Sequence, residues 1–95
     1  MATLTLLQKI KLSLRINHNA LDDLIASEID VAKAEMERNG ILPSAIVETD
    51  DLISEAIKTY VQYLHADDLS EKEGFFGSWT YQLDCLRKTE AYINV

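Results

Sequence analysis

The chain has few of the residues that cross-link, stiffen or loosen a small protein. Its 95 residues include one cysteine, one proline and three glycines. The single cysteine, Cys85, excludes an internal disulfide, which is typical of a protein of the reducing cytoplasm. The shortage of proline and glycine, with 47% hydrophobic residues, argues against a linker or disordered tail. We therefore expect one compact domain spanning residues 1–95.

Long uninterrupted apolar runs are also missing. The most apolar stretch near the N-terminus is broken by Lys9, Lys11 and Arg15. It therefore fits neither the core of a secretion signal nor a membrane span, both of which need a continuous apolar run. We expect no membrane association.

Basic residues are scarce, and their placement is uneven. Nine basic residues face 16 acidic ones, giving a net charge of −7. Residues 1–16 hold three basic residues and no acid, so the rest of the chain carries −10 (−7 minus +3). Such an acidic surface disfavours tight, general DNA binding. The basic cluster of Lys9, Lys11 and Arg15 is either a solvated face or a docking surface for an acidic partner, including another copy of the chain.

The apolar spacing predicts helices in the first half of the chain. A short helix is expected after Thr5 and to end near Ile16, with Lys11 and Arg15 one turn apart on one face. Alternation over residues 12–16 also permits a strand, but no second alternating run exists to pair with it. A longer helix should run from Ala20 to Arg38, with Gly40 as its stop.

The polar break between these two helices is expected to cap them. Asn17 and Asn19 compete with helix through side-chain hydrogen bonds, so they should end the first helix and cap the second. Asp22 and Asp23 then lie where the dipole of the new helix favours carboxylates.

Two further helices are expected in the second half. Asp50 or Thr49 can cap a helix ending near His65. Residues 70–73 have the form of a capping box for the last helix, but Gly74 and Gly77 should delay its regular part until near Ser78. Its buried stripe is predicted to contain Trp79, Leu83, Leu86 and Ile93. Four helices without strands predict an all-α fold, a small irregular antiparallel bundle.

The connection over residues 40–50 is unusually apolar. Its large side chains either fold back over the core or contact a neighbouring subunit or a channel; they are Ile41, Leu42, Ile46 and Val47.

Signals for chemistry are nearly absent. No glycine-rich phosphate loop or nucleophile motif occurs, so we expect no catalytic or cofactor-binding residues and no enzyme activity. His18 and His65 each offer one imidazole beside carboxylates, short of a metal-ligand pattern. Cys85 and most of the seven aromatic residues are expected in the core, and the aromatics lack the interleaved basic residues of a single-strand stacking platform.

Several blocks of the sequence occur in a suggestive order. They are Leu14-Arg15-Ile16, the polar break, Asp23-x-Ile25, Asp51-Leu52-Ile53-x-x-Ala56-Ile57-x-x-Tyr60-Val61 and, more loosely, residues 76–86. In this order and spacing the chain resembles the head-tail connector, or head-completion, proteins of tailed phages over nearly its whole length. The resemblance departs from the family at Asn17 and Asn19, where more acidic residues are expected.

That resemblance implies a structural role. Connectors of this family form a ring, twelvefold in the virion, which docks beneath the portal protein and extends the DNA channel. The implied partners are further copies of the chain, the portal, a neck or tail-completion protein and passing DNA without sequence-specific binding. The implied location is the virion head-tail interface, and the bacterial host cytoplasm during assembly.

The alternatives are a small helical adaptor and a helix-turn-helix regulator. Acidic starts at Asp22-Asp23 and Asp50-Asp51 argue against the regulator, because a recognition helix needs side chains that reach bases.

Overall fold

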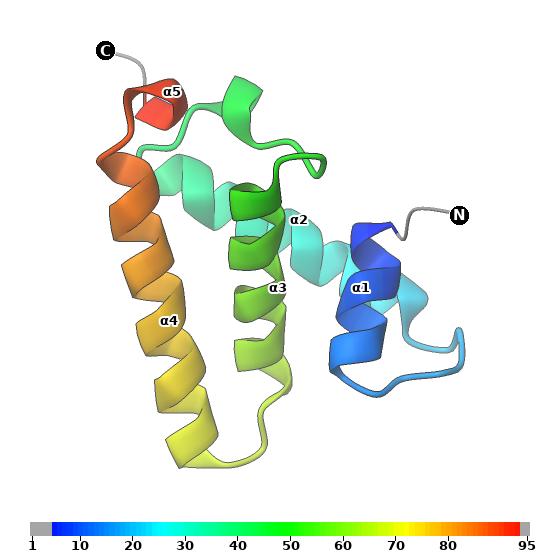
Figure 1. Ribbon diagram of the computed structural model, residues 1–95. Helices are drawn as coiled ribbons and strands as arrows, with labels where there is room; N and C mark the ends of the chain where they lie inside the picture. Colours follow the sequence, from blue (N-terminus) through cyan, green and yellow to red (C-terminus); the bar gives the residue numbers. More distant parts are fainter. Residues whose placement is uncertain (1–4, 94–95) are drawn as a thin grey trace.

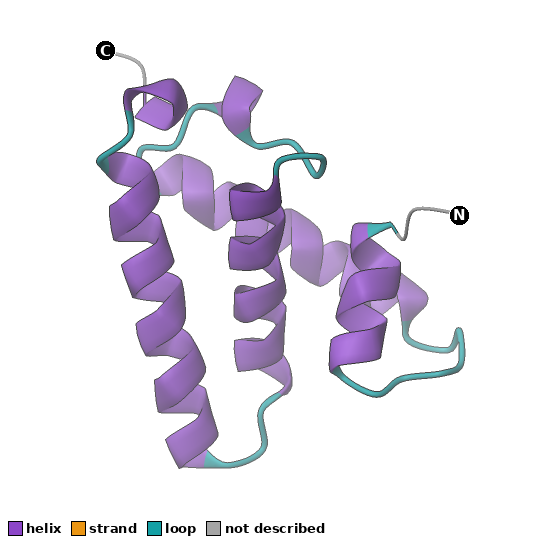
Figure 2. Ribbon diagram, viewed as in Figure 1, coloured by secondary structure: helices purple, strands orange, loops and turns teal. Residues whose placement is uncertain are grey.

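The computed structural model describes residues 5–93, which contain helices and loops but no strand (Figure 2). The predicted all-α fold is confirmed, with four long helices and one short one. In chain order the elements are α1 (Leu6–Ser13), α2 (Asp22–Arg38), the 3₁₀ helix η1 (Pro43–Ala45), α3 (Asp51–His65), α4 (Leu69–Arg87) and α5 (Glu90–Ile93).

The helix α3 lies at the centre of the arrangement (Figure 1). It packs against α1 on one side and α4 on the other, while α2 crosses behind them. α3 and α4 form an antiparallel hairpin joined by residues 66–68. The molecule measures 42 × 36 × 22 Å, so it is flatter than a sphere. Because α3 lies between α1 and α4, the outer surfaces of α1 and α4 lie on opposite sides of it.

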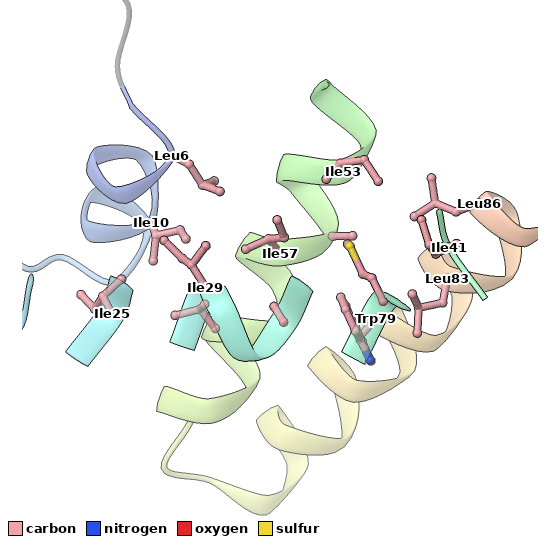
Figure 3. Packing of buried hydrophobic residues seen from close by; sticks show 14 residues of the cluster. Leu6, Ile10, Ile25, Ile29, Ile41, Ile53, Ile57, Trp79, Leu83 and Leu86 are labelled. Carbon is pink, nitrogen blue, oxygen red and sulfur yellow. The ribbon is translucent and has the colours of Figure 1, made fainter. Parts of the chain in front are cut away.

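A single hydrophobic core runs between these helices (Figure 3). Its members follow the i, i+3, i+4 spacing that the sequence predicts for α2 and α3. On α2 they are Ile25, Ile29, Ala32 and Met36, and on α3 they are Ile53, Ala56, Ile57 and Val61. α1 contributes Leu6 and Ile10, and α4 contributes Trp79, Leu83 and Leu86.

Three predicted helix ends are confirmed. The Thr5 hydroxyl accepts the Gln8 N–H, and the Gln8 side chain accepts the Thr5 N–H, which completes a capping box at α1. Asp50 caps α3 by accepting the N–H groups of Leu52 and Ile53. Gly40, at φ +96°, follows α2 in the left-handed conformation that glycine adopts without a steric cost.

The end of α1 differs from the prediction. The helix ends at Ser13, and Arg15 adopts φ +60°, the left-handed conformation that usually requires glycine. The N–H groups of Arg15 and Ile16 return to the carbonyls of Leu12 and Lys11, at 3.1 and 2.9 Å, in a Schellman motif. Arg15 therefore lies beyond the helix and does not share a helical face with Lys11.

The start of α2 also differs. Its N-cap is Leu21, and no side chain caps the helix. The Asn19 side chain instead accepts a hydrogen bond from Lys11 at 2.9 Å, so it is unavailable as a cap, and Asn17 is an exposed loop residue. The prediction that these asparagines cap α2 was wrong, whereas Asp22 and Asp23 do occupy its first turn.

α4 begins at Leu69, close to the predicted capping box at residues 70–73, but its regular part is not delayed to Ser78. Asp68 is its N-cap, accepting the Ser70 N–H at 2.6 Å, and Gly74 and Gly77 lie inside the regular helix. Contacts with α3 offset the glycine cost: the rings of Phe76 and Tyr63 lie 5.3 Å apart, centroid to centroid.

The short helix α5 closes the fold over the start of α3. The Leu42 N–H donates to the Tyr92 carbonyl at 2.7 Å, and the Tyr92 hydroxyl donates to Asp50 at 2.9 Å. Burial, followed by this hydrogen bond to a carboxylate, raises the pKa of Tyr92. Ile93, predicted on the stripe of the last long helix, belongs instead to α5 and packs at the margin of the core.

Candidate functional site

The predicted basic cluster is divided by the structure. Lys11 is largely covered: its side chain is 14% exposed, and its Nζ lies 2.7 Å from the Asp22 carboxylate. It therefore fastens α1 to the start of α2. Lys9 and Arg15 are exposed, so only these two members of the predicted cluster are open to a partner.

An apolar residue lies beside these two cations. Leu12 is 65% exposed, on the side of α1 opposite the buried Ile10. Gln8 and Lys9 share this outer face, and Arg15 follows directly after the helix. We call the set Gln8, Lys9, Leu12 and Arg15 the α1 face. It combines an exposed leucine with two positive charges.

The apolar connection mostly folds back over the core. Ile41 is buried, and Leu42 and Ile46 are half-buried. Val47 is 45% exposed and is the one member of the predicted intersubunit or channel set that is open. Packing back over the core, the first of the two interpretations, therefore describes Ile41 best. Its N–H donates to the Met36 carbonyl at 3.0 Å, which completes the end of α2. A channel or intersubunit role for this connection stays a prediction.

An apolar groove runs between the first half of α3 and the second half of α4. Its volume is about 220 Å³, and its lining is Leu52, Glu55, Tyr81, Gln82, Cys85, Leu86 and Thr89. We call this set the α3–α4 groove. Leu52 and Tyr81 form its edges and are 60% and 70% exposed. Single exposed apolar residues are normal on a protein surface, whereas exposed apolar residues grouped around a groove are typical of an interaction site.

Cys85 lies in this groove and not in the core, so its predicted burial was wrong. The reason is its position on α4: Leu83 and Leu86 face α3, and Cys85 is turned away from both. A hydrogen bond with the Cys85 side chain is the main cause of a raised pKa at Tyr81. The groove therefore holds the only thiol of the chain beside a neutral phenol.

A second, more polar groove lies between α2 and α4 and has a volume of about 530 Å³. Tyr60, Tyr63, Phe76 and Trp79 line it, with Tyr60 and Trp79 ring centroids 4.8 Å apart. Glu35, Arg38 and Arg87 supply its charges. We call it the aromatic groove.

Charges in the aromatic groove are internally paired. Arg38 lies 3.0 Å from Glu35, and Arg87 pairs with Asp84. Burial is the main cause of a raised pKa at Tyr60, and the Glu35 carboxylate adds to it. Of the seven aromatic residues, only Trp79 is fully buried, so the prediction that most are core residues was wrong. Tyr60 and Tyr92 pack at the margin of the core, and Tyr60, Tyr63, Phe76 and Trp79 pack against one another.

In the described part of the chain, each of the two histidines interacts with a single neighbour. His65 Nε2 lies 2.7 Å from Glu28, linking α3 to α2, and His18 accepts the Ala20 N–H at 3.3 Å. Within residues 5–93, no group of three or more His, Cys, Asp or Glu side chains is arranged to hold a metal ion.

The sequence did not single out Leu12, Leu52 or Tyr81 as surface residues. A signal was nevertheless present for each. Leu12 lies about half a turn away from Ile10 on a helical projection, and Leu52 lies outside the ridge that begins at Ile53. Tyr81 lies about half a turn away from Trp79 and Leu83, outside the stripe predicted for the last helix.

None of the helices in the described range combines the length and apolar character needed to cross a membrane. Comparison with known proteins finds no matching family, no similar curated protein and no similar solved structure.

Proposed function

We propose that this chain is a structural head-tail connector subunit of a tailed phage or prophage, which assembles into a ring beneath the portal and extends the DNA channel. The observation that carries the proposal is the order of the sequence blocks from Leu14 to Val61, in a chain that folds as a small helical domain. The function is mechanical, and no residue is assigned a catalytic role.

Exposed apolar residues on opposite sides of α3 support this proposal. Leu12 lies on α1, and Leu52 and Tyr81 border the α3–α4 groove. A subunit in a closed ring touches two neighbours through two different surfaces, so it needs both. The acidic balance of the chain suits a channel wall, where attraction to phosphates would slow the passage of DNA.

Light scattering coupled to size-exclusion chromatography, over a wide range of protein concentration, tests the proposal. We expect a discrete oligomer near a dozen copies, visible as rings by negative-stain electron microscopy. A protein that stays monomeric at every concentration, alone and with a purified portal ring, would contradict it.

A single-partner helical adaptor is the second candidate, and the aromatic groove favours it. Tyr63 and Phe76 are partly open there, beside the arginines of α2 and α4. An adaptor would form a one-to-one complex instead of a ring, so the stoichiometry measured by light scattering separates the two functions.

A further inference from the structure

We propose that the α1 face of one copy docks into the α3–α4 groove of the next copy, with Leu12 as the inserted side chain. The inference rests on the proposed ring and specifies its subunit contact. The two surfaces are different parts of one molecule, and each is complementary to the other surface on a second copy.

The apolar parts are both open to solvent. Leu12 projects from α1 with 65% of its surface open to solvent. The groove volume of about 220 Å³ leaves room for a leucine side chain. Leu52, Tyr81 and Leu86 would surround the inserted side chain. Binding energy concentrates in well-packed, desolvated pockets, and an aliphatic side chain can be the anchor that fills one.

The charges match as well. Lys9 and Arg15 flank Leu12, while Asp51 and Glu55 lie one turn apart beside Leu52. All four side chains belong to exposed residues. Glu55 already pairs with Lys58 at 3.1 Å, but an exposed pair of this kind contributes little and is readily exchanged. The second copy therefore brings positive charge to an acidic rim, which selects this orientation over others.

One polar atom in the groove lacks a partner. The Gln82 Oε1 atom is buried without a hydrogen bond to any other described residue. Gln82 lines the groove, so a docking copy that brings an N–H donor there would give this oxygen a partner. Lys9 and Gln8 of the docking copy both carry donors.

The positions of the two surfaces make the contact heterologous. α1 and α4 lie on opposite sides of α3, so the α1 face of one molecule cannot reach its own groove (Figure 1). Repeating such a contact produces a chain of subunits, which closes into a ring when the rotation permits.

Cys85 allows a direct test, because it is the only cysteine and lines the groove. In Leu12→Cys, a short bismaleimide should join the new thiol to Cys85 of a neighbour, giving a ladder of covalent oligomers on denaturing gels. Val31→Cys is the matched control, since Val31 is 47% exposed on α2, away from both surfaces. The double variant Leu12→Cys, Cys85→Ser should lose the ladder. A Leu12→Cys pattern equal to the Val31→Cys pattern, or one that stops at dimers, would overturn the proposal.

Mixing two variants tests the direction of the contact. Leu12→Glu removes the inserted side chain and Leu52→Lys spoils the groove, and each should weaken self-association at least about tenfold. An equimolar mixture should form heterodimers, because one intact α1 face meets one intact groove. Val31→Glu and Val31→Lys should assemble like the unmodified chain, and circular dichroism checks that all variants fold.

Failure of this inference is distinguishable from failure of the proposed function. If the unmodified chain forms rings while Leu12→Glu and Leu52→Lys form them equally well, the ring stands and this subunit contact is wrong.

Discussion

The helices α3 and α4 are neighbours of similar length, with 15 and 19 residues, but they bury very different shares of their side chains. α3 buries six residues, including the polar Ser54 and Thr59, whereas α4 buries three. The apolar residues of α4 are distributed around the helix, and Leu69, Phe76 and Tyr81 are at least half exposed.

Position in the fold explains this difference. α3 is enclosed by α1, α2 and α4, so nearly every direction around it faces another helix. The hydroxyls of Ser54 and Thr59 are tolerated there because they donate to the carbonyls of Asp51 and Glu55 on their own helix. α4 lies at the edge and has one main neighbour. Stability should therefore depend more on α3 than on α4.

Truncating one large side chain on each helix should give the largest difference in stability between α3 and α4. Ile57→Ala on α3 should cost about 2–5 kcal/mol, because Ile57 is fully buried and its removal leaves a cavity. Phe76→Ala on α4 should cost about 1 kcal/mol, since half of the ring is exposed and its main partner is Tyr63. Urea unfolding followed by circular dichroism measures both. Equal losses would show that α4 is as important to the core as α3.

The N-caps provide a smaller test of the same difference. Asp50→Ala should cost about 1–2 kcal/mol, because Asp50 accepts two amide N–H groups of α3 and the Tyr92 hydroxyl. Asp68→Ala should cost about 0.5–1 kcal/mol, since within residues 5–93 the Asp68 carboxylate caps α4 with a single hydrogen bond, from the Ser70 N–H. The measurement is again the urea unfolding free energy. Tyr92→Phe keeps the cap and removes the hydroxyl. Its loss of stability shows how much of the Asp50→Ala loss comes from the hydrogen bond with Tyr92.

The glycines of α4 give the smallest expected change, and it is a gain. Gly74→Ala and Gly77→Ala should each stabilise by about 0.5–1 kcal/mol, because both lie inside the helix with open space around an added Cβ. Gly40→Ala is the opposite control: its φ of +96° disfavours any side chain, although nothing surrounds the site. Thermal unfolding followed by circular dichroism should raise the midpoint for the first two variants and lower it for the third.

The sequence predicted the helices best where periodicity and caps agreed. The cap of α3 at Asp50 and its end at His65 were both predicted correctly, because each depends on neighbours along the chain. The end of α2, which Gly40 follows, was predicted equally well. In these places local preference and tertiary packing favour the same structure.

The errors lie where distant residues decide the outcome. α4 continues through two glycines because Tyr60 and Tyr63, on another helix, pack against Trp79 and Phe76 beside them. Arg15 takes a glycine-like conformation because the chain must turn back after α1 so that Lys11 can reach Asp22. Cys85 and most of the aromatic residues were expected in the core, but the side of α4 that is buried is the predicted stripe of Trp79, Leu83 and Leu86, and Cys85 lies off that stripe. The two grooves combine residues from different helices, so no sequence pattern outlined them.

The contact between Tyr92 and Asp50 joins positions 42 residues apart through a helix of only four residues. A unit that small cannot hold itself in place, so it closes after the α3–α4 hairpin has formed and opens before that hairpin comes apart. The Leu42 amide, which donates to the Tyr92 carbonyl, should consequently exchange its hydrogen with solvent sooner than the amides of α3. α5 thus acts as a latch on the apolar connection, and its opening would release the Leu42 amide without dissolving the core.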